Sequence, residues 1–411
     1  MMRSMFAGVS GLRAHQTMTD VVANNIANVN TVGFKASRVQ FADTLSQLIR
    51  GSSGGTGEAT AGINPQQVGL GVSVSSTNKI FTQGGSQLTG RATDVAITGE
   101  GFFGVGFAGE TLFTRAGSFS FDDDGYLTDP TGGVVQGWIA AQDGTVNINE
   151  PVSGMQVPVN ATIPPSATTL ISIAGNLDES VAIGELQNTA IDVVDGLGES
   201  HRMTISFEKA AANQWNVSVI DPSGASLGSS TIDFDPADGT LLTATPPSFT
   251  YTPAGGTAFT FDLDLGAAGS VDALTQFAGA ASAQAIDQNG LGIGSLRSFA
   301  ISNDGTLSGV FSNGETAVLG QLAITTFSNP AGLLGSGDSR FRATNASGQA
   351  LVGIPNSAGR GGIAAGTLEM SNVDLSEEFT NLIIAQRGFQ ANSRIITVSD
   401  EMIQELVNLK R

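Results

Sequence analysis

Residues 375–409 read LSEEFTNLIIAQRGFQANSRIITVSDEMIQELVNL, and this segment decides how the rest of the chain is organised. Its apolar residues recur at alternating spacings of four and three, which places them on one face of a helix. That face carries Leu375, Phe379, Leu382, Ala385, Phe389, Asn392, Ile396, Ser399, Ile403 and Leu406. Asp374, followed three residues later by Glu377, is typical of a capping box at a helix start. The sequence therefore predicts a helix of about 35 residues and ~50 Å, with a seam broken only by Asn392 and Ser399.

The other end of the chain predicts a second amphipathic helix, from Met5 to Asn30. Its apolar face is weaker, with members such as Leu12, Val22 and Ile26. Two early glycines each lower its intrinsic helicity by roughly 1 kcal/mol relative to Ala. We therefore expect this helix to need a partner, and we expect the two ends of the chain to meet.

The composition favours β-rich domains over a helical enzyme. Of 411 residues, 54 are Gly, only 13% are charged and 40% are hydrophobic, which allows two to four domains with real cores. The formal net charge is −19, and about −20 of it lies between the two terminal segments. An acidic body of this kind argues against nucleic acid as a partner, because binding it needs clusters of Lys and Arg.

Targeting signals and cysteine chemistry are not predicted. The chain has no Cys, so it can form neither a disulfide framework nor a thiol site. The sequence contains no run of 18 apolar residues, so no membrane span is predicted. The N-terminus lacks the apolar core of a cleaved secretory signal. We expect either a cytoplasmic protein or one exported without a cleaved signal.

A connector at residues 31–70 leads out of the first helix. Within it, Phe41 to Ile49 is predicted to form a short helix. Gly51 to Gly62 is rich in Gly, Ser and Thr, and we expect it to be mobile.

The remaining chain is predicted to form two β domains, one inserted in the other. Residues 71–145 are predicted to contain short strands separated by turn signals, and residues 286–370 show the same pattern. The shared pattern predicts that the two segments form one discontinuous inner domain. Residues 146–285 begin Pro- and Thr-rich and predict an inserted outer β domain. The predicted fold class is therefore mainly β with long terminal α-helices. Its nested, discontinuous β domains are capped by a helical coiled-coil domain of residues 1–30 and 371–411.

Motifs that could carry chemistry fail their structural conditions. GEGFFG at residues 99–104 matches a dinucleotide fingerprint but runs into a strand instead of a helix. GASLG at residues 224–228 matches a nucleophile elbow, but both histidines, His15 and His201, lie upstream of it. Asp122-Asp123-Asp124-Gly125 lacks the EF-hand spacing and predicts an acidic β-turn. We therefore predict no catalytic residue, no metal and no cofactor.

Three groups of motifs resemble the rod–hook family of bacterial flagellar axial proteins. The first is NNIANVNTVGFK at residues 24–35, and the second is NVDLSEEFT at 372–380 with QRGFQAN at 386–392. The third is TRAGSFS at 114–120, followed by DGYL at 124–127 and the pair Gly137-Trp138. These motifs are highly specific, and the resemblance spans residues 1–145 and about 285–411.

The resemblance implies a helical tube built from many copies of one chain. The terminal helices of each subunit would form an inner coiled-coil layer around a central channel, with the β domains outside. The tube would join the rotary motor to the filament as a bendable joint. Subunits would leave the cell unfolded through the flagellar type III export apparatus, which agrees with the missing cleavable signal. The implied partners are the distal rod protein, the hook cap and the hook–filament junction proteins, with no membrane insertion.

The resemblance also places the functional residues. The expected axial assembly interface consists of Leu12, Val22, Asn25, Ile26, Leu375, Phe379, Leu382, Phe389, Ile396, Ile403 and Leu406. The expected connector residues are Gly33, Phe34 and Phe41. The family's β motif contributes Thr114, Arg115, Gly117, Phe119, Gly125 and Tyr126. No role is predicted for Gly388.

Two alternatives stay open from sequence. Length and the inserted domain favour the hook-type members of the family over the much shorter rod proteins, but a distal rod protein is the alternative within it. A secreted β-sandwich binding protein or hydrolase with oligomerising helices is less favoured. With only two Trp and two Tyr, the chain is poorly equipped to stack on carbohydrate.

Overall fold

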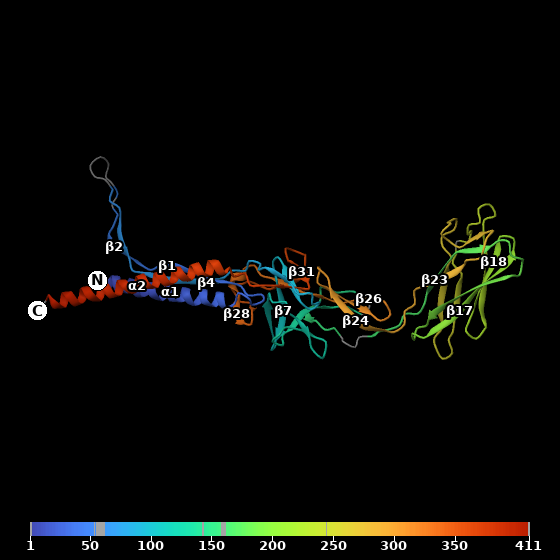
Figure 1. Ribbon diagram of the computed structural model, residues 1–411, viewed down its shortest axis with the longest axis horizontal. Coiled ribbons are helices and arrows are strands. Elements are labelled where there is room, and N and C mark those ends of the chain that lie inside the picture. Colours follow the sequence, from blue (N-terminus) through green and yellow to red (C-terminus); the bar gives the residue numbers. More distant parts are fainter. Residues whose placement is uncertain are drawn as a thin grey trace. The chain divides into compact units, whose positions relative to one another are not determined.

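Two α-helices and many short strands form the chain, as Figure 1 shows. The computed structural model describes residues 2–52, 54, 62–141, 144–157, 162–243 and 245–409. The chain divides into two compact units. Unit 1 contains Met1–Pro158, Ala300–Ser308 and Val318–Arg411, and unit 2 contains Val159–Phe299 and Gly309–Ala317. The predicted class, mainly β with long terminal helices, is confirmed.

Helices α1 (Met2–Ala27) and α2 (Leu375–Asn408) lie side by side in unit 1 and run in opposite directions (Figure 1). The predicted start of α2 is confirmed, because Oδ1 of Asp374 accepts hydrogen bonds from the N–H groups of Ser376 and Glu377 at 2.8 and 3.3 Å. Glu377 and Glu378 in the first turn also suit the positive end of the helix dipole. Within the described residues, neither helix has the length and apolarity needed to cross a membrane.

The segment after α1 forms β-hairpin ladders, so the short helix predicted over Phe41 to Ile49 is wrong. Strands β1 (Ser37–Asp43) and β4 (Val72–Lys79) pair antiparallel, as do β2 (Ser46–Arg50) and β3 (Gln66–Gly69). The ladder satisfies the backbone polar groups that a short helix would leave open at its ends. The predicted mobility of Gly51 to Gly62 falls mostly on residues 53 and 55–61, which lie outside the described residues, so it stays a prediction.

In the rest of unit 1, strands from the first part of the sequence pair with strands from the last part. β6 pairs with β31, β7 with β27, and β8 with β29. The strands are β5 (Ser86–Leu88), β6 (Val95–Thr98), β7 (Phe102–Phe107), β8 (Glu110–Thr114), β9 (Ser120–Phe121), β10 (Leu127–Thr128), β11 (Val134–Ile139), β12 (Ser153–Gly154), β27 (Ile324–Thr326), β28 (Leu334–Gly337), β29 (Arg340–Arg342), β30 (Leu351–Gly353), β31 (Gly362–Ala365) and β32 (Thr367–Glu369), with a 3-10 turn at Pro330–Gly332. The discontinuous inner β region is therefore held together by hydrogen bonds between distant parts of the chain.

Aromatic side chains fill the core of this β region. Phe102, Phe113, Phe327 and Phe341 are buried together, with Phe81 packed against them. Their rings meet edge to face, with centroids 4.8 Å apart for Phe113 and Phe327. Edge-to-face contact is a favourable geometry for aromatic pairs and adds to the gain from burial.

Unit 2 has its own hydrophobic core, built mainly by two four-stranded sheets. Buried and half-buried residues alternate along β18, where Trp215, Val217 and Val219 point inward, as the period of two in a strand requires. The four-stranded sheet β16-β17-β18-β19 and the sheet β20-β21-β14-β23 supply most of this core. The strands are β13 (Thr162–Ile163), β14 (Leu170–Ala174), β15 (Asn176–Asp178), β16 (Leu186–Val194), β17 (Ser200–Ala211), β18 (Gln214–Ile220), β19 (Ser226–Asp233), β20 (Ser248–Tyr251), β21 (Phe259–Asp264), β22 (Thr275–Phe277) and β23 (Gln284–Gln288).

Among the described residues, the chain passes from one unit to the other within three strands, β24 (Gly294–Ile301), β25 (Thr306–Phe311) and β26 (Thr316–Leu322). The expected boundaries near residues 145 and 285 stay a prediction.

Candidate assembly interface

Small and polar residues line the face that α1 and α2 share. Ala385 and Ser399 of α2 are buried, and the hydroxyl of Ser399 lies 3.5 Å from that of Ser4 on α1. Val22 and Asn25 of α1 are buried as well. Small residues let two helix backbones approach closely, and large apolar side chains are then left on other faces.

Gly11 and Gly388 each lie directly against a side chain of the opposite helix. A Cβ atom on Gly11 would lie 2.7 Å from the side chain of Asn392, and one on Gly388 would overlap the imidazole of His15. The same imidazole meets Phe41 of β1 edge-on, with ring centroids 5.8 Å apart. Each glycine therefore makes room for a polar side chain of the partner helix. This contact with His15 explains Gly388. In the sequence, Gly388 stood out only because a glycine in a helix interior lowers helix stability relative to Ala.

Asn25 joins three elements of unit 1. Its Nδ2 donates to Oε1 of Glu378 on α2 at 2.7 Å and to the carbonyl of Ser37 on β1 at 2.8 Å, and its Oδ1 accepts from the N–H of Ser37 at 3.0 Å. Burial raises the pKa of Glu378; the hydrogen bond from Asn25 opposes this and the nearby charge of Glu377 adds to it. The central Asn of the N-terminal motif therefore locks the helix pair to the connector.

The other predicted interface residues differ in burial. Leu12, Ile26, Leu382, Ile396 and Ile403 are half-buried. Four more remain exposed on α2: Leu375, Phe379, Phe389 and Leu406. Phe379 is 51% exposed and Phe389 is 43% exposed. Their role in assembly stays a prediction.

Six further exposed apolar side chains on α2 were not predicted from the sequence. They are Ile383, Ile384, Ile395, Val398, Met402 and Val407. We call these residues, together with Leu375, Phe379, Phe389 and Leu406, the α2 apolar strip. Helix α1 does not cover the α2 apolar strip, and its side chains stay exposed in the single chain. Large apolar side chains left exposed in this number on one helix are typical of an interaction site.

A buried charge cluster ties the connector to the β region. Glu369, at the end of β32, pairs with Nζ of Lys35 at 2.6 Å and with Nη1 of Arg115 at 3.4 Å, and it accepts from the N–H of Gly84 at 3.0 Å. All three charged side chains are at most 1% exposed. Burial lowers the pKa of Lys35, while the hydrogen bond to Glu369 and its charge work to raise it. Arg115 was predicted from the sequence as a functional residue, whereas Lys35 and Glu369, which are 334 residues apart, were not.

The predicted connector and the predicted β motif meet at Gly33. This residue has φ +67°, and a Cβ atom there would overlap the backbone of Ala116. Its N–H donates to the carbonyl of Glu369 at 2.8 Å. Phe34, the next connector residue, has its ring under Nζ of Lys79 at 5.3 Å. The N-terminal motif is therefore packed against the β motif by its backbone.

The remaining β-motif residues have local structural roles. Thr114 donates to the carbonyl of Ser339 at 3.0 Å. Phe119 is buried edge-on to Phe103. Gly117 packs so closely that a Cβ atom would overlap the carbonyl of Val95. Two more residues, Gly125 and the half-buried Tyr126, close the predicted acidic turn with hydrogen bonds from their N–H groups to Asp122 at 3.1 and 2.6 Å.

As predicted, GEGFFG runs into a strand, β7. GASLG begins in the turn between β18 and β19, and its last three residues are the first three of β19.

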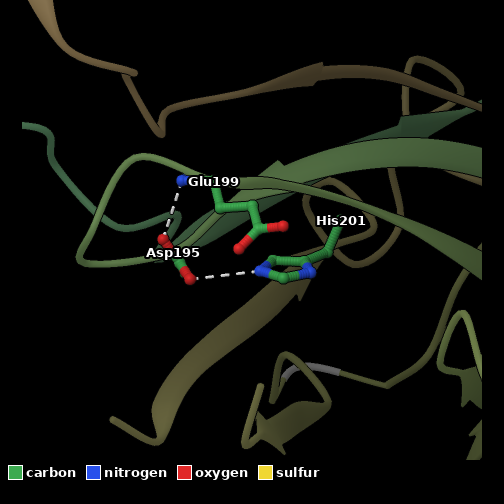
Figure 2. A group of neighbouring side chains, drawn as sticks. All are labelled: Asp195, Glu199 and His201. Carbon is green, nitrogen blue, oxygen red and sulfur yellow. Dashed lines mark hydrogen bonds and ion pairs between the residues drawn. The ribbon is translucent and has the colours of Figure 1, made fainter. Parts of the chain in front are cut away.

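One group of potential metal ligands lies in unit 2, and Figure 2 shows it. Within the described residues, Asp195, Glu199 and His201 place ligand atoms within 4.8 Å of one another. Asp195 already accepts from Nε2 of His201 at 3.1 Å and from the N–H groups of Leu197 and Glu199 at 2.9 Å. Burial works to raise the pKa of Asp195, but these hydrogen bonds outweigh it and hold the pKa low. The group fixes the turn between β16 and β17.

Comparisons with known proteins cover almost the whole chain. Residues 5–35 match the family described as flagella basal body rod protein, and residues 364–409 match the flagellar basal body rod FlgEFG protein C-terminal family. Residues 96–176 match the flagellar hook protein FlgE/F/G D1 domain, and residues 178–291 match the flagellar basal body protein FlaE D2 domain. The two end matches therefore use the same segments that build the α1–α2 pair.

Several curated relatives match from end to end. The chain is 39% identical to the flagellar hook protein FlgE of Borreliella burgdorferi over 443 aligned residues, covering 100% of each chain. It is 37% identical to that of Treponema pallidum, again over 100% of each, and 35% identical to that of Escherichia coli over 98% of each.

A solved structure supports the same fold. The crystal structure of Helicobacter pylori flagellar hook protein FlgE2 aligns with a TM-score of 0.50 at 16% identity, covering 69% of this chain and 100% of that one. Because the relatives share more than 30% identity over whole chains, they settle the family. The chain belongs to the flagellar hook protein family, a structural family of the bacterial flagellum.

Proposed function

We propose that many copies of this chain polymerise into a bendable tube that transmits torque from the flagellar rod to the filament. The observation that carries the proposal is the α2 apolar strip, which a single chain leaves exposed. Neighbouring copies of α1 and α2 cover it in the tube. Full burial of a large apolar side chain contributes about 1.5–3 kcal/mol, and these ten side chains are 40–65% exposed, so covering them recovers about half of that value at each position and favours assembly.

The proposed layout follows from where the strip lies. The α1–α2 pair forms the inner layer around a central channel, and the two β domains, with the expected boundaries at residues 71–145 with 286–370 and at 146–285, lie outside it. The proposed axial interface keeps the predicted residues on both helices and extends them by the newly found members of the strip.

Bending is proposed to act through the connector. The β1–β4 ladder is fixed to the helices by Asn25, while the β2–β3 ladder has mostly exposed residues. Few contacts hold the β2–β3 ladder, so it can shift between neighbours at low cost. The hairpin then absorbs the displacement between copies as the tube curves.

The chain has a place in the flagellum, and its finer location and partners are proposed from the resemblance. We place it outside the cell, exported through the type III apparatus without a cleaved signal. The distal rod protein, the hook cap and the hook–filament junction proteins contact it at the ends of the tube.

Substitution in the α2 apolar strip tests the assembly proposal. Phe389→Glu should abolish polymers in sedimentation and negative-stain microscopy while leaving the thermal unfolding of the monomer unchanged, because Phe389 is already 43% exposed in the single chain. The matched control is Gln390→Glu, which adds the same charge one residue away at an exposed polar position. Polymers of normal yield and form from Phe389→Glu would refute the proposed interface.

Deletion in the connector tests the bending proposal. Removal of residues 51–62 should leave assembly intact and give straight or rigid tubes. Tubes with unchanged curvature and flexibility would rule out the connector as the element that absorbs displacement.

A further inference from the structure

A pocket of about 590 Å³ in unit 1 lies where the N-terminal motif and the β motif meet. Asn24 and Asn28 of the N-terminal motif line it, as do Thr114 and Ser118 of the β motif. Neither the contact between α1 and α2 nor the buried charge cluster accounts for this pocket. Its lining contains the side chain of Lys79, the last residue of β4.

Lys79 differs from the other lysines among the described residues because its ammonium has neither an ion-pair partner nor a hydrogen-bond acceptor. Lys35 pairs with Glu369, Lys209 donates to the carbonyls of Glu179 and Val181, and Lys410 lies outside the described residues. The ammonium of Lys79 lies over the rings of Phe34 and Phe341, 5.3 and 5.6 Å from their centroids. Within the described chain it forms neither an ion pair nor a hydrogen bond.

The surroundings of Lys79 favour an incoming carboxylate. Burial lowers the pKa of Lys79, so its charged form lacks the solvation it would have in water. Arg340 in the same pocket is already paired with Asp129 at 2.8 Å. Asp338 also lines the pocket, but its side chain is exposed. Asn24 also lines the pocket, and its side-chain amide makes no hydrogen bond within the described residues, so its N–H donors are free.

The acidic turn of residues 122–124 supplies suitable carboxylates. All three Asp residues are exposed, and among the described residues the carboxylates of Asp123 and Asp124 have no partner. The turn is held rigid by the hydrogen bonds of Gly125 and Tyr126 to Asp122 and by the one from Nε2 of Gln156 to the carbonyl of Asp124 at 2.9 Å. A rigid turn loses little conformational entropy when it docks.

We propose that the pocket around Lys79 receives the acidic turn Asp122–Asp124 of a second copy of this chain. The pocket and the turn are different surfaces of one unit, and a contact between two different surfaces joins copies head to tail, as an open helical polymer requires. The occupant is a second copy because every neighbour in a homopolymer carries one such turn for each pocket. This inference rests on the proposed function, since it assigns one contact of the polymer.

Zero-length crosslinking of polymers made from equal parts of ¹⁴N- and ¹⁵N-labelled chains tests the contact. A carbodiimide joins a lysine amine directly to a carboxylate that touches it. We expect peptides in which Lys79 is linked to Asp123 or Asp124, with half of them carrying one light and one heavy partner. A polymer whose Lys79 is free, linked elsewhere, or linked only within one chain refutes the contact alone. Failure to form polymers refutes the proposed function and this contact with it.

A charge swap tests the same contact energetically. Lys79→Glu alone, and Asp123→Lys with Asp124→Lys, should each raise the critical concentration for assembly about tenfold, and the three changes combined should restore it. Asp304→Lys, at another exposed Asp-Gly turn of unit 1, is the control and should have no such effect. Restoration also shows that the single variants fold. Single variants that assemble normally, or a swap that does not restore assembly, would overturn the proposal.

Discussion

Glu369→Gln is the most informative single change in this chain, because Glu369 is the only anion of the buried cluster in the described structure. Its carboxylate contacts Lys35 at 2.6 Å, Arg115 at 3.4 Å and the N–H of Gly84 at 3.0 Å. Glutamine has the same shape and keeps one acceptor oxygen. The change therefore removes charge and leaves the packing intact.

The expected cost follows from burial. Lys35 is 0% and Arg115 1% exposed, so neither cation can regain water when its counter-charge is lost. Breaking a buried ion pair by removing one partner costs about 3–5 kcal/mol. Because the Gln oxygen still accepts from one donor, we expect the lower end, about 3 kcal/mol. With a urea slope of about 3 kcal/mol/M, the unfolding midpoint of unit 1 should fall by about 1 M.

The two tryptophans allow each unit to be followed separately. Trp138 is buried in unit 1 and Trp215 is buried in unit 2. In a Trp215→Phe background, urea unfolding followed by fluorescence reports unit 1, and in a Trp138→Phe background it reports unit 2. We expect Glu369→Gln to lower the first midpoint and leave the second unchanged. Urea is preferable to guanidinium here because it does not screen charges.

Glu110→Gln is the matched control. Glu110 forms an ion pair with Arg342, but the two side chains are 57% and 51% exposed. Exposed pairs contribute about 0–1 kcal/mol, so the midpoint should hardly move. Equal small effects of Glu369→Gln and Glu110→Gln would refute the assignment of the buried cluster as the junction. An equal loss in both units would show that the effect is not local.

Three further predictions concern the helix pair. Gly11→Ala should destabilise unit 1 because its Cβ atom would lie 2.7 Å from Asn392, whereas Gly8→Ala, with neighbours at 3.4 Å, should stabilise it by up to about 1 kcal/mol in the same urea assay. Gly388→Ala should also destabilise unit 1, because its Cβ atom would overlap the imidazole of His15. In a double-mutant cycle, His15→Ala should remove most of that loss of stability, and additive effects would rule out the contact. Burial raises the pKa of Glu378 in the folded chain, so the folded state binds the proton more tightly than the unfolded state does. The free energy of unfolding therefore falls as pH rises from the ordinary pKa of a Glu side chain through the raised pKa of the folded state. Glu378→Gln should therefore be at least as stable as the parent at pH 7 and lose this advantage in acid; the opposite pH trend would contradict the burial argument.

The periodic patterns of the sequence were the most reliable guides to the fold. The 4–3 spacing and Asp374 predicted α2, and the short segments separated by turn signals in residues 71–145 predicted strands such as β7 and β8. Both signals are local, because they depend on the helix period and on turn residues that are close in sequence. The segment Phe41 to Ile49 was predicted wrongly because its structure depends on pairing with strands that follow a long gap in sequence.

The sequence by itself determined the two terminal helices, the β-rich body between them, the family and the absence of the common catalytic motifs. Only the tertiary structure decided which residues the helices use against each other and which they leave free. The role of Asn25 is visible only when folding brings Glu378 and Ser37 beside it. The role of Gly388 is visible only when folding brings His15 beside it. The same holds for the α2 apolar strip, because a helical period shows that a face is apolar but not which part of that face a partner covers. Burial depends on contacts between residues far apart in the chain, and those contacts exist only after folding.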